Sequence, residues 1–272
     1  MDLYEALLKR RSVRKYSETA PDAETLRSIG AAAEALKPLL PDVKVRVELL
    51  GRMQLRQLFT STGSVKAPCY AVITSEDAPL AQANAGFIGE QLAADLTRRG
   101  MGTCWSGSLK AAKTGFPLPY VITIGFGFPK DGVLPEIPAE RRCRKASGEI
   151  CLHPPKGKRL ARLVEAVRIA PSAMNGQPWR LDPEGSSALH LYREKPSFLT
   201  AAGPGRLKIP VPGSLLEKVQ EIDCGIALAH ILLAAEHFGS EPEFRRMPGK
   251  EDAGDKLTYV MSAVLKREKT VR

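Results

Sequence analysis

Three arginines and a serine lie within five consecutive positions near the N-terminus, in the segment Arg10–Arg14 (RRSVR). Guanidinium groups and a hydroxyl can make several charge-assisted hydrogen bonds to one phosphate group. The segment follows an amphipathic stretch, Asp2–Lys9, which predicts a short helix. Arginines that end a helix also interact favourably with its dipole while they stay in solvent. These residues alone leave both interpretations open, a phosphate site and a solvated basic turn.

Residues 170–180 (APSAMNGQPWR) form a second polar segment, after a predicted helix at Leu160–Ile169. Two prolines and a glycine predict a rigid loop. A simple connector from helix to strand does not explain Ser172, Asn175 and Gln177 together. Such a loop can offer these side chains and free backbone groups to a planar polar ring, while Trp179 anchors its end in the core. This signal is the stronger of the two.

Other residues with chemical potential lack the right neighbours. The four histidines are isolated from carboxylates and cysteines at metal-binding spacing: His153, His190, His230 and His237. Gly125 and Gly127 do not belong to a GxGxxG segment that leads into a helix, which argues against a Rossmann nucleotide loop. Cys104 is expected to be a small packed residue, not a nucleophile. We therefore expect no metal site.

Composition indicates a soluble globular protein. The 272 residues are 43% hydrophobic and carry a formal net charge of +10. No stretch approaches the roughly 20 apolar residues of a membrane helix, so no membrane partner is expected. The basic residues are spread from end to end, which favours a generally basic surface over a nucleic-acid partner. Five scattered cysteines without a CxxC pair predict reduced thiols and a cytoplasmic protein.

The predicted elements occur twice in the same order, with a proline- and glycine-rich connection at Pro129–Pro155 between the two sets. Strand Val43–Leu50 is matched with Ser187–Tyr192, and the other matched segments are a helix at 84–100 with 222–238 and a strand at 119–129 with 257–265. We therefore predict an α+β fold with mixed or antiparallel sheets, flanking helices and two similar α/β halves, 1–150 and 151–272, from an ancient duplication.

RRSVRKY together with APSAMNGQPW resembles the FMN-dependent nitroreductase family. The glycine-rich segment Gly100–Trp105, followed by the IGFGFP strand, looks like the corresponding segments of that family. Arg142–Lys145 resembles, more weakly, the late basic residues that reach the phosphate. The resemblance extends over most of the chain and implies a nitroreductase-like fold that binds FMN.

The order of the motifs departs from the family pattern. Ordinary members carry both motifs close together in one subunit and are homodimers with the flavin at the interface. Here the second motif comes only after the first half has ended, and residues 35–41 contain no such motif. The resemblance implies an internally duplicated branch of nitroreductases, in which the dimer is fused into one chain. Such an intrachain pseudo-dimer would have one complete FMN site and could be a monomer.

The resemblance assigns roles residue by residue. The phosphate and ribityl chain would be held by Arg10, Arg11, Ser12 and Arg14, with further positive charge from Arg142 and Arg144. The isoalloxazine ring would lie against the second motif, at Pro171, Ser172, Ala173, Asn175 and Gln177. Ser106, Gly107 and Ser108 would run past the ring atom N5. This last stretch departs from the family, whose members often have an acidic residue there, and the departure puts the redox tuning in doubt.

The implied activity is oxidoreduction. NADH or NADPH would reduce the flavin, and a small electron-poor acceptor, such as a nitroaromatic or a quinone, would reoxidise it. The cofactor carries this chemistry, so no side-chain acid or base is nominated as catalytic. The alternative is a protein that stores or senses FMN with little turnover, and the altered stretch near N5 motivates it.

Overall fold

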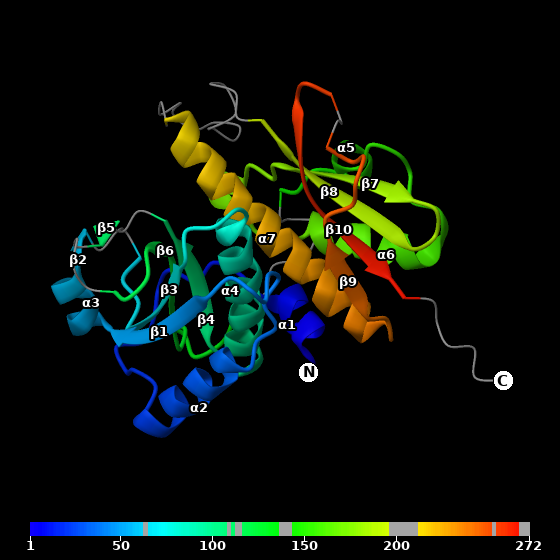
Figure 1. Ribbon diagram of the computed structural model, residues 1–272. Coiled ribbons are helices and arrows are strands. Elements are labelled where there is room, and N and C mark those ends of the chain that lie inside the picture. The colour runs from blue at the N-terminus through cyan, green and yellow to red at the C-terminus, as the bar shows by residue number, and fades with distance from the viewer. Residues whose placement is uncertain are drawn as a thin grey trace. The chain divides into compact units, whose positions relative to one another are not determined.

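The protein is described by a computed structural model (Figure 1). It describes residues 1–61, 65–107, 110–111, 116–135, 143–195, 212–251 and 254–266. The chain forms two compact units, Met1–Pro138 and Ala139–Arg272. The boundary expected at residue 150 falls within the second unit, directly after the short helix α5 (Ser147–Ile150), which packs against other elements of that unit.

The first unit is built on a four-stranded antiparallel sheet in the order β1-β3-β6-β4. Its strands are β1 (Val45–Gly51), β3 (Cys69–Ser75), β4 (Gly102–Ser106) and β6 (Tyr120–Gly127). The helices are α1 (Leu3–Lys9), α2 (Ala23–Glu34), α3 (Arg52–Leu58) and α4 (Ala81–Arg98), and a small second sheet pairs β2 (Phe59–Ser61) with β5 (Lys110–Ala111). Helix α4 packs on the sheet and against α1 and α2. Every residue of β3 is buried, as its continuous apolar sequence predicts.

The second unit contains a four-stranded antiparallel sheet in the order β7-β8-β10-β9. Its strands are β7 (Trp179–Glu184), β8 (Ala188–Glu194), β9 (Pro242–Arg245) and β10 (Leu257–Leu265). The helices are α5, α6 (Gly157–Arg168), the 3-10 turn η2 (Ala173–Asn175) and α7 (Gly213–His237). Helix α7 contacts all four strands and packs against α6 (Figure 1). Among the described helices, none combines the length and the apolar character that crossing a membrane requires.

The two sheets share one topology, which confirms the predicted α+β fold with two similar halves. In each unit the first two strands are neighbours, a long helix follows, and the fourth strand lies between the second and the third. One predicted match was wrong. By position in the strand order, β1 corresponds to β7 and β3 corresponds to β8. The sequence pattern had matched residues 43–50 with residues 187–192, which lie mostly in β8. Strand β7 (WRLDPE) was not predicted, because it contains Pro183 and proline is depleted in strands.

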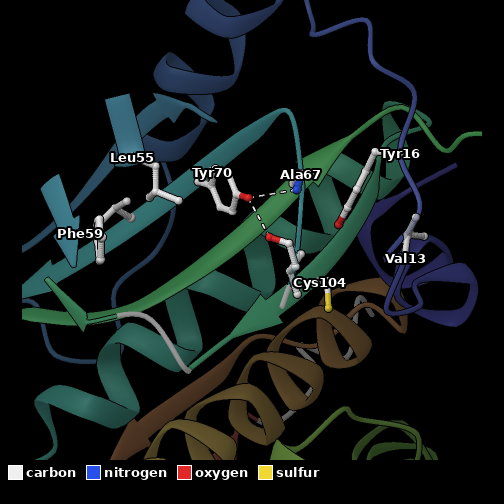
Figure 2. Packing of buried hydrophobic residues seen from close by; sticks show 9 residues of the cluster. Val13, Tyr16, Leu55, Phe59, Ala67, Tyr70 and Cys104 are labelled. Atoms are coloured by element: carbon white, nitrogen blue, oxygen red, sulfur yellow. Dashed lines mark hydrogen bonds between the residues drawn. The ribbon is translucent and has the colours of Figure 1, made fainter. Parts of the chain in front are cut away.

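A buried cluster holds the polar N-terminal segment to the sheet of the first unit (Figure 2). Val13 and Tyr16, both from RRSVRKY, belong to it; the other members are Leu55, Phe59, Val65, Ala67, Tyr70, Val72 and Cys104. The Tyr16 hydroxyl donates to the carbonyl of Gly125 at 3.2 Å. The Tyr70 hydroxyl accepts from Ala67 N–H at 3.0 Å and donates to the Val65 carbonyl at 2.8 Å. Val13 and Tyr16 therefore anchor the predicted phosphate motif to the core, while Ser12 and Arg14 of the motif stay exposed.

Gly102 permits the close contact between this segment and β4. Val13 N–H donates to the Thr103 carbonyl at 2.9 Å, and Ser12 forms a parallel bridge with Thr103. A Cβ atom on Gly102 would lie 2.6 Å from Cβ of Val13, closer than real Cβ atoms come. The glycine thus fixes how near the arginine segment lies to the strand.

Gly102→Ala is expected to destabilise the protein by about 1–3 kcal/mol, because the added methyl group overpacks the contact with Val13. Gly30→Ala is the control, since Gly30 lies within α2 and a Cβ there meets no atom within 4 Å. That change should stabilise the helix by roughly 0.5–1 kcal/mol. Urea unfolding of both variants measures the difference; equal effects would contradict this account of Gly102.

Candidate functional site

The four phosphate residues predicted in the first motif follow the end of α1 and differ in burial. Arg10 caps the helix through its N–H, which donates to the Ala6 carbonyl at 2.7 Å. The side chain of Arg11 is partly buried and its Nε donates to the carbonyl of Pro135. Ser12 and Arg14 are exposed. The segment thus combines one buried guanidinium with groups that solvent and a ligand can reach.

Arg10 is only 5% exposed and is held by a buried carboxylate. Its Nε lies 3.2 Å from Oε1 of Glu90, a fully buried residue in the middle of α4. The other oxygen of Glu90 accepts from the indole N–H of Trp105 at 2.9 Å. Nη1 of Arg10 is buried and has no hydrogen-bond partner among the described residues. An anion that accepts from this nitrogen would satisfy it, because an unpaired buried donor costs free energy.

Neither Glu90 nor Trp105 was expected at this site from the sequence. Helix α4 is buried along almost its whole length, so a glutamate in its centre requires a partner. Gly89 lets Trp105 approach: a Cβ there would lie 2.4 Å from the indole ring. A carboxylate flanked by apolar helix positions was the available signal, but the sequence did not indicate which cation it pairs with.

The second motif forms a tight loop around η2 in which three residues adopt left-handed backbone angles. Met174, Asn175 and Gln177 have φ of 52°, 59° and 49°. This conformation is costly for residues other than glycine and persists only where the surroundings enforce it. One enforcing contact is the Ser172 hydroxyl oxygen, which accepts from Gln177 N–H at 2.9 Å. Hydrogen bonds, as well as the prolines, therefore constrain this loop.

The expectation that this loop offers free backbone groups was wrong for four of its N–H groups. Asn175 N–H donates to the Ser172 carbonyl and Gly176 N–H to the Ala173 carbonyl, each at 3.0 Å. Gln177 N–H is bound by Ser172, and Ala173 N–H donates to a carboxylate oxygen of Asp223 at 2.9 Å. The loop is consequently a preformed surface, not an array of open donors.

Arg144 and Lys145, which precede α5 in the sequence, are hydrogen-bonded to the same loop. Arg144 donates to the side-chain oxygen of Asn175, whose amide nitrogen donates to the Cys143 carbonyl at 2.8 Å. Lys145 N–H donates to the Gln177 side-chain oxygen at 2.8 Å, and its Nζ to the Gln177 carbonyl at 3.1 Å. Burial lowers the pKa of Lys145. Arg144, assigned to the phosphate by sequence, thus lies beside the ring loop, together with Lys145, which sequence reasoning missed.

The stretch expected near N5 is only partly described. Ser106 ends β4 and is buried, and Gly107 after it is exposed. Ser108 and Arg142 lie outside the described residues. Nearby, Cys104 is buried, and burial raises the pKa of its thiol. A thiol in this state is a poor nucleophile, as expected for a packed residue.

Another constellation resembles a hydrolytic triad but cannot act as one. His190 binds the hydroxyl of Ser262 through Nδ1 and the carboxylate of Glu184 through Nε2, both at 2.6 Å. Ser262 and His190 have no exposed surface, and the serine hydroxyl also shares a 2.6 Å hydrogen bond with Tyr259. A substrate cannot reach this serine. The described residues also contain no group of three or more side chains suited to a metal ion.

Glu90→Ala is expected to cost about 3–5 kcal/mol of stability, because it leaves the Arg10 guanidinium buried without its counter-charge. Glu165→Ala is the matched control: it removes an ion pair with Arg168 on α6, and Glu165 is half exposed. That loss should stay below about 1 kcal/mol. Urea unfolding distinguishes them, and a small loss for Glu90→Ala would show that its ion pair is not a buried anchor.

Comparisons with known proteins agree with the fold. A family model described as "Putative TM nitroreductase" matches residues 2–235. The chain is similar to a protein from Thermotoga maritima whose crystal structure is described as that of a "putative nitroreductase". The TM-score is 0.63 and the identity 24%, and the match covers 97% of this chain and 94% of that one. This likeness shows that the chain has the nitroreductase-like fold over its length.

Shorter likenesses occur as well. A nitroreductase family protein from Clostridium difficile 630 matches with 14% identity and a TM-score of 0.44, over 55% of this chain and 96% of that one. One from Clostridium novyi NT matches with 19% identity and a TM-score of 0.40, over 50% and 89%. No curated protein matches the sequence. Because the family model extends over most of the sequence, the chain belongs to the nitroreductase family that this model describes.

Proposed function

We propose that this protein is an FMN-dependent oxidoreductase of the nitroreductase type that binds one FMN per chain. NADH or NADPH is the electron donor, and a small electron-poor molecule, such as a nitroaromatic or a quinone, is the acceptor. The observation that carries the proposal is the family match over residues 2–235, which includes both polar motifs. No second copy of the chain is required, so a monomer can be active.

The residues of the first motif fit a phosphate group. Arg10 offers a buried guanidinium nitrogen to which no described residue is hydrogen-bonded, and Glu90 fixes the orientation of that side chain. Ser12 and Arg14 are exposed and can supply a hydroxyl and a second guanidinium. A planar guanidinium binds phosphate oxygens with two parallel hydrogen bonds, which favours this role for arginine over lysine. Phosphate binding is thus assigned to the first unit.

The second motif fits a flat aromatic ring. Four of its N–H groups are bound within the unit, which constrains the shape of the loop without a ligand. The Ser172 oxygen accepts one hydrogen bond, and its O–H has no acceptor within the described part of the chain, so it can donate to a ring heteroatom. Ala173 and Met174 supply apolar surface beside it, Met174 being 44% exposed, whereas Pro171 is buried beneath the loop's surface. That the first motif binds the phosphate and the second motif the ring is what the sequence resemblance implies.

FMN, when bound, supplies hydride and electron transfer at its ring. The chain binds the phosphate, orients the ring through a preformed loop and carries a basic net charge that attracts anionic ligands. No side chain is nominated as proton donor. Since the Ser106–Ser108 stretch lacks the acidic residue common in the family, FMN storage or sensing is the alternative function, and reduction by NAD(P)H distinguishes the two.

Purified protein is expected to take up one FMN per chain, measured by visible absorption against protein concentration. Anaerobic NADH or NADPH should then bleach the flavin, and a quinone or nitroaromatic should restore its colour. Two FMN molecules per chain would contradict the single site. Bound flavin that neither nicotinamide reduces would favour storage, and a protein that takes up no FMN would refute the proposal.

Arg14→Ala is expected to weaken FMN binding by about tenfold or more, because a charge-assisted hydrogen bond contributes roughly 1.5–3 kcal/mol. Riboflavin, which lacks the phosphate, should bind the variant as it binds the wild type. Lys15→Ala is the control, since Lys15 is the next residue and is also exposed and basic. Flavin fluorescence titrations of the wild type and both variants give the affinities for FMN and for riboflavin. Equal losses for FMN and riboflavin would refute the phosphate role of Arg14.

A further inference from the structure

The long helices of the two units end in the same way. Gly100 and Gly239 follow α4 and α7 with φ of 81° and 73°. The next residue in each case donates back across the helix end, Met101 N–H to the Leu96 carbonyl at 2.9 Å and Ser240 N–H to the Ala235 carbonyl at 2.8 Å. These ends therefore give a residue-by-residue correspondence between the helices. Sixteen positions before each glycine, α4 has Asn84 and α7 has Asp223.

These two corresponding residues make the same hydrogen bond. Helices α2 and α6 have their C-caps at Ala35 and Ile169, and the residue four positions later is Leu39 in one unit and Ala173 in the other. Leu39 N–H donates to Oδ1 of Asn84 at 2.8 Å. Ala173 N–H donates to Oδ1 of Asp223 at 2.9 Å. In both units, a buried side chain of the long helix binds the loop that follows the preceding helix.

What differs between the units is the loop and the chemistry of the residue that binds it. The loop at 35–41 lacks the polar motif, and a neutral amide holds it; Asn84 also binds Leu40 N–H at 3.1 Å and the carbonyls of Leu40 and Val43 at 3.3 and 3.4 Å. The loop that contains the motif is held by a carboxyl group instead. Asp223 is only 4% exposed, and a buried carboxylate costs far more to desolvate than an amide.

We propose that Asp223 is the positioning residue of the 171–177 loop: its carboxyl oxygen fixes Ala173 and so sets the shape that the flavin ring binds. This inference rests on the proposed function for its ligand. The bonded Ala173 begins η2, and the left-handed Met174 and Asn175 follow directly. Without an acceptor at Asp223, Ala173 N–H would lose its partner at the point where the costly backbone conformation starts.

The carboxyl group of Asp223 can also ionise, whereas an amide cannot, and this difference can be measured as a dependence of stability on pH. Burial raises the pKa of Asp223 to about 7, while the Ala173 N–H lowers it in part. The adjacent thiol of Cys224 interacts electrostatically with Asp223, with Arg193 of β8, which donates to Gln220 at 3.1 Å, and with Glu221 of α7. Because the folded state holds the proton more tightly than the unfolded state, ionisation of Asp223 should reduce stability as pH rises from about 4 to about 7.

Three variants test the inference: Asp223→Ala, Asp223→Asn and Asn84→Ala. Asp223→Ala should weaken FMN binding by about tenfold, the effect of roughly one lost hydrogen bond. Asp223→Asn should bind FMN as the wild type does, because Asn84 shows that an amide oxygen can fill this role. Asn84→Ala loses more hydrogen bonds but should leave the FMN affinity unchanged. If Asn84→Ala and Asp223→Ala lose the same FMN affinity, both effects reflect general destabilisation and the inference is overturned.

Two measurements need no flavin and keep the inference separate from the proposed function. Amide hydrogen exchange of residues 172–177 should be faster in Asp223→Ala and unchanged in Asp223→Asn. The loss of stability between pH 4 and 7, measured by urea unfolding, should be smaller in Asp223→Asn than in the wild type. If the wild type takes up no FMN, the proposed function fails. Exchange that does not respond to Asp223→Ala refutes the role of Asp223 whatever FMN does.

Discussion

A polar side chain on a buried helix must find a partner, because leaving it unpaired costs several kcal/mol. Helices α4 and α7 are buried over most of their length and still contain such residues. Glu90 binds Arg10, and Asp223 binds Ala173. His230 binds the Ala166 carbonyl of α6 at 2.8 Å. The requirement that these groups be satisfied connects the cores of the two units to the polar segments that carry the proposed chemistry.

Much of the fold could be predicted because it follows from local pattern. The all-buried β3 and the long helices stand out as apolar runs and helical periodicity, and the two polar motifs stand out by composition. Strands β7 and β9 were missed, since both contain proline and each owes its place to the neighbour with which it pairs. Local pattern does not contain that pairing information.

The details of the site were harder to predict, because its partners are distant in the sequence. The sequence marks Arg10 and Asn175 as polar residues in unusual segments. It does not show that Arg10 meets a carboxylate from the middle of α4, or that Asn175 meets Arg144. The loop at 170–180 was expected to offer free backbone groups, yet four of its N–H groups are bound within the unit. Burial and pairing are properties of the folded chain, and composition gives only the candidates.

The strand order of each unit has a consequence for how the protein is made. Strands β6 and β10 are the last of their sheets along the chain, and each lies between two strands that precede it. During synthesis on the ribosome the earlier strands emerge with unpaired edges, and neither sheet is complete until its final strand has emerged and paired with both neighbours. Such edges can pair with other chains. The second unit closes only once β10 has emerged, so we expect the nascent chain to depend on rapid closure, or on a chaperone, at that stage.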